Sequence, residues 1–506
     1  MLAALIFIFF TVIFFATVSP DIMFEDSGEF AISSFTLGVG HPPGYPLHTL
    51  LGRLFQFLPA GNPGFRINVM SSFFGALGVA VLFLAARRFG FSTFASLIGA
   101  AACGASKALW SQSAIAEVYA LNLFLNTVLL MCVAALPTAK RRLPIVIALL
   151  LGLTAANHYT TLAAFVPLVL FVIFRYEGFS PRSQSVRLAA GLFVALLAVM
   201  IYAQIPLRAA AEPLFDWRAP TTWSLFIEHV RRVQFSSWEN QLGFHIPTIM
   251  KYVSSFIRNL PVEFFAGFLF IALLGVALLL TERLKTGLTL VWLFLVQSVG
   301  ILLAIRFHSD DAGLSVVRVF YIGAYVVIGL FIAAGLDGLF TQISRSGAKY
   351  LRIPLALAAV VFLVIQVVKI YPINNFSSDN RFEKFDRDIF RFLPRDSIYY
   401  LYGTQFTAPA MYWNGVRGLR RDVTLVDSSG NLLRNEIKKV YGSVDWVNLD
   451  LAVNDLVEHY GKREKQGFSF PRTFDEGGPV TMQRGPLFFA SDKIVCNPNG
   501  WRPGDY

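Results

Sequence analysis

The sequence predicts a polytopic α-helical membrane protein, with about eleven transmembrane helices and a small α/β domain after them. Three observations predict this class. The 506 residues are 55% hydrophobic and only 15% charged, with mean hydropathy +0.57, whereas soluble domains carry about 25% charged residues. Apolar stretches long enough to span a bilayer recur up to residue 371, and basic residues gather between alternate pairs of them. An ordinary soluble enzyme is thereby excluded.

The predicted helices follow from the apolar stretches in order. We interpret the first stretch as a retained helix, because it lacks the basic leading segment and the small-residue cleavage site of a signal peptide. The two shortest stretches are 143–157 and 159–174. The predicted helices are 2–18, 68–86, 92–109, 114–136, 143–157, 159–174, 188–207, 263–281, 286–305, 316–340 and 353–371.

Basic residues indicate the orientation of these helices. With the first residue inside, every short inner loop is basic, as the positive-inside rule requires. An odd number of helices then places the C-terminal end outside. The net charge of +11 is therefore interpreted as a topology signal, and no nucleic-acid partner is expected. The residues in question are Arg87, Arg88, Lys140, Arg141, Arg142, Arg175, Arg182, Arg187, Arg283, Lys285, Arg345, Lys349 and Arg352.

Three segments are too polar to cross a membrane. Residues 19–67 and 208–262 form a first and a second outer loop, and tryptophans among charges in the second are typical of interfacial helices. The chain thus divides into a membrane domain, 1–371, and an outer domain, 372–506.

The outer domain is long enough for a small folded unit. Residues 382–392 have helical apolar spacing, and 397–402 and 422–427 have the composition of strands. Strands that alternate with helices predict an α/β arrangement.

The first outer loop concentrates groups capable of chemistry. Glu25, Asp26 and Glu29 lie within five residues, and three carboxylates at a membrane surface are costly unless they are hydrated or functional. One of them can serve as a general base that takes a proton from a hydroxyl. The alternative is a solvated loop that holds the first helix in place. The motif GHPPGYP at 40–46 follows, and its prolines and glycines predict a loop held in one shape.

His41 and His48 flank this proline-rich turn. A histidine beside a carboxylate suits phosphate or metal, but no second ligand stands at metal-like spacing, so we expect no metal. Arg53 and Arg66 occupy the same loop, against the positive-inside trend. They either bind an anion or pair with the acids of the loop.

Further polar residues fall at the outer ends of predicted helices. Glu117 and Tyr119 open one helix and His158 closes another, as functional groups or as helix caps and interface residues. Arg208 and Arg318 also lie outside. Each guanidinium suits a lipid phosphate or, for Arg318, an ion pair with a nearby aspartate.

Several motifs resemble the protein O-mannosyltransferase-like family of C-type glycosyltransferases, which includes an animal enzyme acting on plexin and Met-type receptors. The most specific are DSGEF at 26–30 and GHPPGYPL at 40–47, followed by GN and RIN within 61–68. EVY with LN at 117–122, IPLRA at 205–209 and, more loosely, RVFY at 318–321 are also similar. The resemblance covers about residues 20–330.

This resemblance implies a C-type glycosyltransferase fold and transfer of a sugar from a polyprenyl-phosphate carrier on the outer face. The sugar is expected to be mannose, and the acceptor a protein serine or threonine hydroxyl or a glycan. We expect no cofactor beyond the lipid-linked donor, and expect the acceptor and membrane lipids as the other partners. The protein is expected to be a multi-pass protein of a cell inner membrane, with its active site and C-terminal end on the periplasmic or luminal side.

The residues then take the following expected roles. Asp26 and Glu29 are catalytic, with Asp26 favoured as the base. Arg208, Arg318 and His41 bind the donor phosphate. The remaining substrate-pocket residues are Glu25, Pro43, Tyr45, Glu117, Tyr119 and His158.

Two other functions use similar groups. A transporter or flippase places ionisable residues near the bilayer midplane and often shows repeated halves. Here those residues gather at one face and no repeat is evident, which favours an enzyme. A ligase that transfers a whole lipid-linked glycan remains the second alternative.

Overall fold

The computed structural model describes most of the membrane domain and part of the outer domain. Glu25 and most of the predicted helix 159–174 lie outside the described residues. The described residues are 1–23, 26–135, 143–158, 162, 164–166, 181–235, 246–301, 314, 317–393, 395–396, 398–401, 404–427, 467–469, 481–484 and 487–490.

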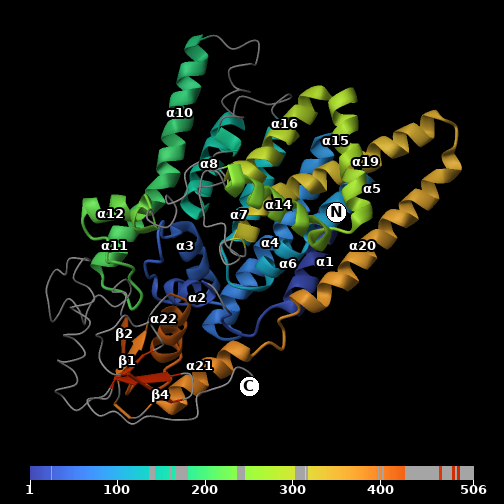
Figure 1. Cartoon of the computed structure of the whole chain (residues 1–506). Coiled ribbons are helices and arrows are strands. Elements are labelled where there is room, and N and C mark those ends of the chain that lie inside the picture. Colours follow the sequence, from blue (N-terminus) through green and yellow to red (C-terminus); the bar gives the residue numbers. More distant parts are fainter. Residues whose placement is uncertain are drawn as a thin grey trace.

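Apolar helices form the body of the protein (Figure 1). By length and composition, four helical stretches of the described chain can cross a membrane, or five if the pair α14 and α15, bent by 118°, counts as one. The four are Pro63–Arg88, Gly191–Ala210, Arg318–Arg345 and Lys349–Asn374. A helical membrane protein is thus confirmed, and the number eleven stays a prediction. The helices of this part are α1 Leu2–Thr17, α4 Pro63–Arg88, α5 Thr93–Gly104, α6 Lys107–Ala114, α7 Tyr119–Ala135, α8 Leu143–His158, α10 Pro181–Val199, α11 Gln204–Ala210, α14 Ile246–Glu263, α15 Ala266–Glu282, α16 Leu284–Leu295, α19 Ile322–Arg345 and α20 Arg352–Asn374.

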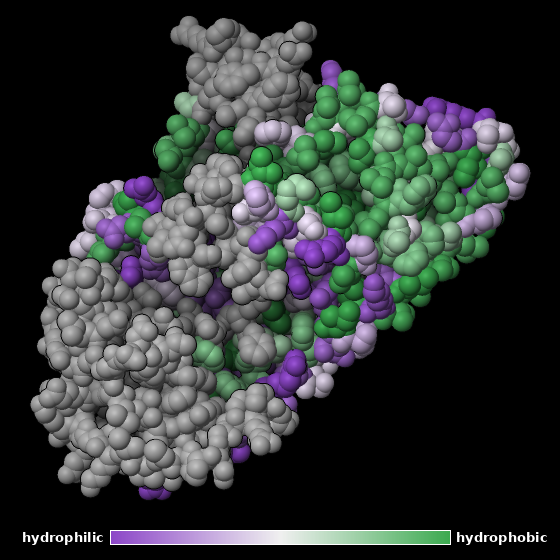
Figure 2. Space-filling model, viewed as in Figure 1, coloured by the Kyte–Doolittle hydropathy of each residue, from purple (hydrophilic) through white to green (hydrophobic). Residues whose placement is uncertain are grey.

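The outermost helices expose apolar side chains. Figure 2 shows hydrophobic residues covering the side of the molecule on which α20 lies. Ile353, Leu357 and Val368 of α20 are 60–70% exposed, which water would penalise and lipid would not. This surface is the one expected of a helix that faces the acyl chains.

Helix α19 lies at the centre of the bundle, and glycines bring it close to two neighbours. A Cβ on Gly335 would stand 2.1 Å from the carbonyl oxygen of Ile271 in α15, and one on Gly99 of α5 would stand 2.3 Å from that of Gly329. Helices in a membrane gain their packing energy from such close approach, since water drives no association there. The bundle therefore depends on small residues at these crossings.

The first outer loop is not an extended loop but two short helices, α2 Ser27–Thr36 and α3 Pro46–Phe55. Eight consecutive residues of α2, from Ser27 to Ser34, are buried. A helix that is covered on all sides has no amphipathic pattern, so the helical character of α2 was not evident from its residues. Pro46, which suggested a rigid turn, occupies the first turn of α3, where proline is favoured.

The second outer loop pairs with the first. After α11 the chain runs through residues 211–222 into α12 Trp223–Val230 and a 3₁₀ turn, Val233–Phe235. The Val39 amide donates to the Phe215 carbonyl at 2.9 Å, and the Trp217 amide donates to the Val39 carbonyl at 3.0 Å. This bridge fixes the GHPPGYP segment against the second loop.

The outer domain combines helices with a mixed sheet beside α2 (Figure 1). Strands β2 Thr424–Asp427 and β3 Gly467–Ser469 flank β1 Ile398–Leu401 in parallel, with Ile398 opposite both Thr424 and Gly467. β5 Leu487–Ala490 and β4 Thr481–Arg484 continue it antiparallel, in the order β2-β1-β3-β5-β4. Helices α21 Arg381–Phe392 and α22 Thr404–Met411 complete it, and α21, β1 and β2 coincide with the predicted helix and strands.

The close packing at the glycine crossings leads to a prediction about thermal stability. Replacement of Gly335 by alanine (G335A) should lower the melting temperature of the detergent-solubilised protein by several degrees, because overpacking costs about 1–3 kcal/mol. G191A is the matched control: its Cβ would meet Ala148 at an ordinary 3.4 Å. Equal melting temperatures for the two variants would contradict close packing of α19 on α15.

Candidate active site

Asp26 stands at the N-terminus of the buried helix α2. Its carbonyl accepts the first helical hydrogen bond from the Phe30 amide at 2.9 Å, and the Ser27 hydroxyl accepts from the Met23 amide at 3.1 Å. The Asp26 side chain makes no capping hydrogen bond to the described residues and is 40% exposed. A carboxylate is favoured at this end of a helix, since the helix dipole presents positive charge there.

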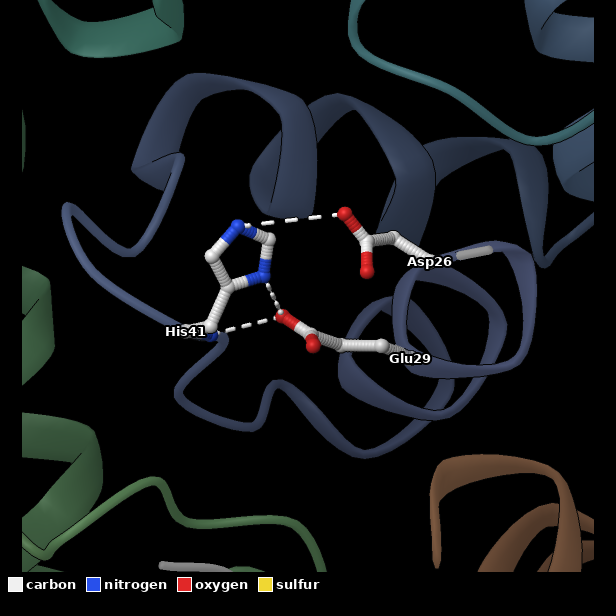
Figure 3. A group of neighbouring side chains, drawn as sticks. All are labelled: Asp26, Glu29 and His41. Atoms are coloured by element: carbon white, nitrogen blue, oxygen red, sulfur yellow. Dashed lines mark hydrogen bonds and ion pairs between the residues drawn. The ribbon is translucent and has the colours of Figure 1, made fainter. Parts of the chain in front are cut away.

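Glu29 lies one turn further along α2 and is fully buried, with 0% of its side chain exposed. Its Oε1 accepts a hydrogen bond from the His41 main-chain amide at 2.6 Å and lies 2.8 Å from His41 Nδ1 (Figure 3). A Cβ on Gly40 would stand only 2.8 Å from the same oxygen, so residue 40 must be glycine for this approach. Glu29 therefore fixes both the main chain and the ring of His41.

His41 lies between two carboxylates. Its Nε2 is 3.8 Å from Asp26 Oδ2 and 3.0 Å from the Tyr45 hydroxyl, whereas Nδ1 faces Glu29 (Figure 3). Burial opposes protonation of the ring, but the charges of Glu29 and Asp26 outweigh it and raise the pKa of His41. Burial likewise raises the pKa of Glu29, while His41 acts against that rise. Both shifts favour the protonated form of the group concerned.

The same three side chains could hold a metal ion. One ligand atom from each of Asp26, Glu29 and His41 lies within 4.8 Å of the others. The premise that His41 has no second ligand at suitable spacing is therefore wrong, because the turn at 37–40 folds His41 back onto α2. Imidazole and carboxylate groups suit a divalent cation, although both ring nitrogens already face protein groups.

Aromatic rings surround His41. The Tyr45 ring is 5.0 Å from it, with Trp217 and Phe235 of the second loop at 5.9 and 6.2 Å. The Tyr45 ring also stacks on His158 at 6.0 Å with an interplanar angle of 14°. Residues predicted in different loops thus meet around one imidazole.

The ends of α7 and α8 join this group, as their shared side of the membrane suggested. Tyr119 lies 5.6 Å from His158, and the Asn157 side chain donates to the Val118 carbonyl at 3.2 Å. Glu117 is buried, and its charge contributes to the raised pKa of Tyr45, of which burial is the main cause.

The proline-rich turn places Tyr45. Pro43 is buried and follows a cis peptide bond, and Gly44 and Tyr45 both adopt positive φ, at 91° and 41°. A Cβ on Gly44 would stand 2.7 Å from Ile205 and 3.0 Å from His229 Nε2. His48 packs on Phe30, and burial lowers its pKa to about 3, so it is a neutral residue of the interior.

The two predicted phosphate-binding arginines lie in α11 and in the 3₁₀ turn Arg318–Tyr321. Arg208 donates to the carbonyls of Leu37 and Thr36 at 2.8 and 3.1 Å and so caps the C-terminal end of α2. Asp26 is at the other end of that ten-residue helix, about 15 Å away at 1.5 Å per residue. Arg318 is exposed at the start of a 3₁₀ turn, and the aspartates weighed as its partners lie outside the described residues.

The two arginines of the first loop donate hydrogen bonds to main-chain carbonyls. Arg53 donates to the Phe35 carbonyl, and Arg66 to the carbonyls of Gln56 and Ala60. Neither of the two weighed roles, anion binding or pairing with the loop acids, describes these contacts.

Sequence reasoning missed Arg232, which follows α12 with φ of 57°. Its guanidinium carbon lies 5.0 Å from the Phe235 ring, and that ring meets His41. Its positive charge lowers the pKa of both His41 and Tyr45, as a lesser influence beside burial. Nothing in the local sequence distinguishes Arg232 from its neighbour Arg231, so only the fold reveals it.

Known proteins are similar to the segment that carries these residues. The family described as "Protein O-mannosyl-transferase TMEM260 N-terminal domain" matches residues 26–179, which begin at Asp26 and include Glu29, His41, Tyr45, Glu117 and His158. The Mus musculus protein O-mannosyl-transferase TMEM260 is 26% identical over 436 residues, covering 82% of this chain and 61% of the relative.

The predicted family resemblance is confirmed. The Dictyostelium discoideum protein O-mannosyl-transferase tmem260 is also similar, at 22% identity over 473 residues, or 83% of this chain and 56% of that protein. The chain therefore spans somewhat more than half the length of these O-mannosyltransferase relatives.

Solved structures share the fold. ArnT from Cupriavidus metallidurans bound to undecaprenyl phosphate superposes with a TM-score of 0.56 at 13% identity, covering 98% of this chain and 99% of ArnT. Its apo state gives 0.55, with 92% and 93% covered. The O-mannosyltransferase-like chain thus has a C-type glycosyltransferase fold.

The contact between His41 and Glu29 leads to a prediction about the pKa of His41. In Glu29→Gln the pKa of His41 should fall, because the nearer of the two charges that stabilise the imidazolium is gone. NMR titration of histidine-labelled protein measures this, with a His41 variant to assign the signal among seven histidines. Glu117→Gln, which removes a carboxylate near Tyr45, should leave the pKa of His41 in place.

Proposed function

We propose that this protein is a membrane glycosyltransferase. It moves a sugar, mannose, from a polyprenyl phosphate to a hydroxyl of a protein or glycan on the outer face. The observation that carries the proposal is an exposed carboxylate, Asp26, set at a buried helix end beside His41 within the segment that O-mannosyltransferase relatives share. The fold is that of ArnT, whose structure holds undecaprenyl phosphate.

The burial of the two carboxylates divides their roles. Asp26 is 40% exposed and can reach a substrate, whereas Glu29 is fully buried and tied to His41. We therefore assign Asp26 as the base and Glu29 as a positioning residue. The acceptor hydroxyl gives its proton to Asp26 as its oxygen attacks the anomeric carbon. The bond from that carbon to the phosphate oxygen breaks, the lipid phosphate leaves, and the configuration inverts.

Positive charge must stabilise the departing phosphate. His41 supplies it as an imidazolium, a state that Glu29 and Asp26 favour. Arg232, whose guanidinium lies over the Phe235 ring, supplies a second charge. We place the donor phosphate beside these two residues, since Arg208 already uses its guanidinium to cap α2.

The proposed chemistry requires no divalent metal. Both nitrogens of His41 lie within hydrogen-bonding distance of protein groups, Glu29 and Tyr45, and cationic side chains replace the Lewis acid. Pocket residues on the acceptor and sugar side are then Tyr45, Pro43, Tyr119, Glu117 and His158. The proposed location is an inner membrane, with the site and the outer domain on the periplasmic or luminal side.

The base assignment is tested with purified protein in liposomes, labelled polyprenyl-phosphate mannose and an acceptor polypeptide. Asp26→Asn keeps the shape of the side chain and should lower turnover by about 10²–10⁴-fold, whereas Glu29→Gln should be milder. Normal turnover in Asp26→Asn with an inactive Glu29→Gln would reverse the two roles. Full activity in both variants would exclude a carboxylate base.

The same assay separates the alternatives. Movement of lipid across the bilayer without transfer indicates a flippase, and use of lipid-linked oligosaccharide alone indicates a glycan ligase. Addition of a chelator should leave transfer unchanged. Loss of activity that divalent ions restore would show instead that Asp26, Glu29 and His41 ligate a metal.

The phosphate assignment predicts different effects for two arginines. Arg232→Gln should raise the KM for the lipid-linked donor at least about tenfold, because a charged hydrogen bond is worth roughly 1.5–3 kcal/mol. Arg208→Gln should act on thermal stability through the loss of its cap on α2. Donor KM values measured side by side decide this: a rise confined to Arg208→Gln would return the phosphate to Arg208.

A further inference from the structure

A buried aspartate outside the catalytic cluster joins three distant parts of the chain. Asp21 lies between α1 and α2 and is 5% exposed. Its Oδ1 accepts from the Tyr412 hydroxyl at 2.6 Å, and its Oδ2 pairs with Arg417 Nη1 at 2.9 Å. Both partners belong to the outer domain, 391 and 396 residues away along the chain. Burial without partners would be costly for a carboxylate, so these contacts are interdependent.

The start of α4 completes this junction. The Gly64 amide donates to the Tyr412 hydroxyl at 3.1 Å, and a Cβ on Gly64 would stand 2.4 Å from Asp21 Oδ1. Asn68 donates to the carbonyls of both Ser19 and Asp21 at 2.9 Å. The segment that leads into α2 is therefore held from the membrane domain on one side and from the outer domain on the other.

The residues next to Tyr412 also contact α2 and orient Arg417. Ile22 and Ala31 share a hydrophobic cluster with Tyr412 and Trp413. Two guanidinium groups lie over the Trp413 ring, that of Arg417 at 5.2 Å and that of Arg387 at 5.3 Å. A Cβ on Gly28 of α2 would stand 3.1 Å from the backbone nitrogen of Pro409 in α22, so the two helices are in close contact.

We propose that Tyr412 and Arg417 are positioning residues for the transfer reaction. They hold Asp21, which fixes the entry into α2 and thereby the location of Asp26 five residues later. The outer domain is then part of the catalytic unit, in addition to any role in presenting the acceptor. This inference rests on the proposed function, since it needs Asp26 to act at the reacting atoms. A displacement of about 1 Å at a catalytic group can cost on the order of 10²-fold in rate.

The full-length protein in liposomes tests the inference. Tyr412→Phe and Arg417→Gln should each lower kcat at least about tenfold while the KM for the lipid-linked donor stays within about twofold, because the phosphate site is intact. Arg417→Lys, which keeps the charge, should restore part of kcat. Tyr399→Phe is the matched control and should retain wild-type turnover. Tyr399 is a buried tyrosine of the same domain, and among the contacts of the described residues its side chain has none with Asp21.

Measurements well below each melting temperature separate positioning from stability. The inference fails if Tyr412→Phe and Arg417→Gln turn over like Tyr399→Phe, or if their loss appears in donor KM or in the fraction of folded protein. Asp26→Asn distinguishes a failure of the positioning role from a failure of the proposed base. If it is inactive while the Tyr412 and Arg417 variants are normal, the function stands and the positioning role is wrong. If it is active, the proposed base is wrong instead.

Discussion

The pairing of Glu29 with His41 is the contact on which the rest of the site depends. A carboxylate with no exposed surface is stable only if its charge is matched, and His41 matches it with its amide and its ring. The same pairing draws residues 37–41 back over α2 and sets the start of the turn that carries Pro43 and Tyr45. Tyr45 in turn brings His158 and Tyr119 to the group. Without this ion pair, the aromatic contacts would have no common centre.

In the proposed reaction, the pairing also separates two tasks that a single carboxylate could not perform. A base needs access to its substrate, and a side chain that fixes a histidine needs burial so that water does not compete. Asp26 and Glu29 differ in this respect although only three residues separate them, because the N-terminus of α2 reaches the surface and its first full turn does not. A short buried helix with an exposed first residue supplies both environments.

Much of this arrangement could be predicted from the sequence, and the remainder could not for physical reasons. Composition and apolar run length predicted the membrane class, and the acidic DSGE segment with GHPPGYP predicted the segments from which Asp26, Glu29 and His41 come together. Helix α2 was missed because burial on all sides removes the amphipathic pattern. Arg232 was missed because His41 lies 191 residues away along the chain. The Asp21 junction was missed because Arg417 lies 396 residues from Asp21. Contacts of that range leave no local signature in a single sequence.

The helix bundle and the segments outside it are stabilised in different ways, and this difference explains why the outer domain is needed to support α2. In the bundle, glycines at the α19 crossings permit backbone contact, and the packing needs no polar group. At the outer surface water is present, and segments there keep one conformation only if burial and paired charges exclude it. The chain leaves α1 at Thr17, and Asn68 of α4 holds it to the bundle through the carbonyls of Ser19 and Asp21. Tyr412 and Arg417 hold Asp21 from the other side, and Ile22 packs in the cluster around Trp413. In the proposed reaction, the Asp26 carboxylate therefore depends on a second, water-excluding layer, which the outer domain supplies.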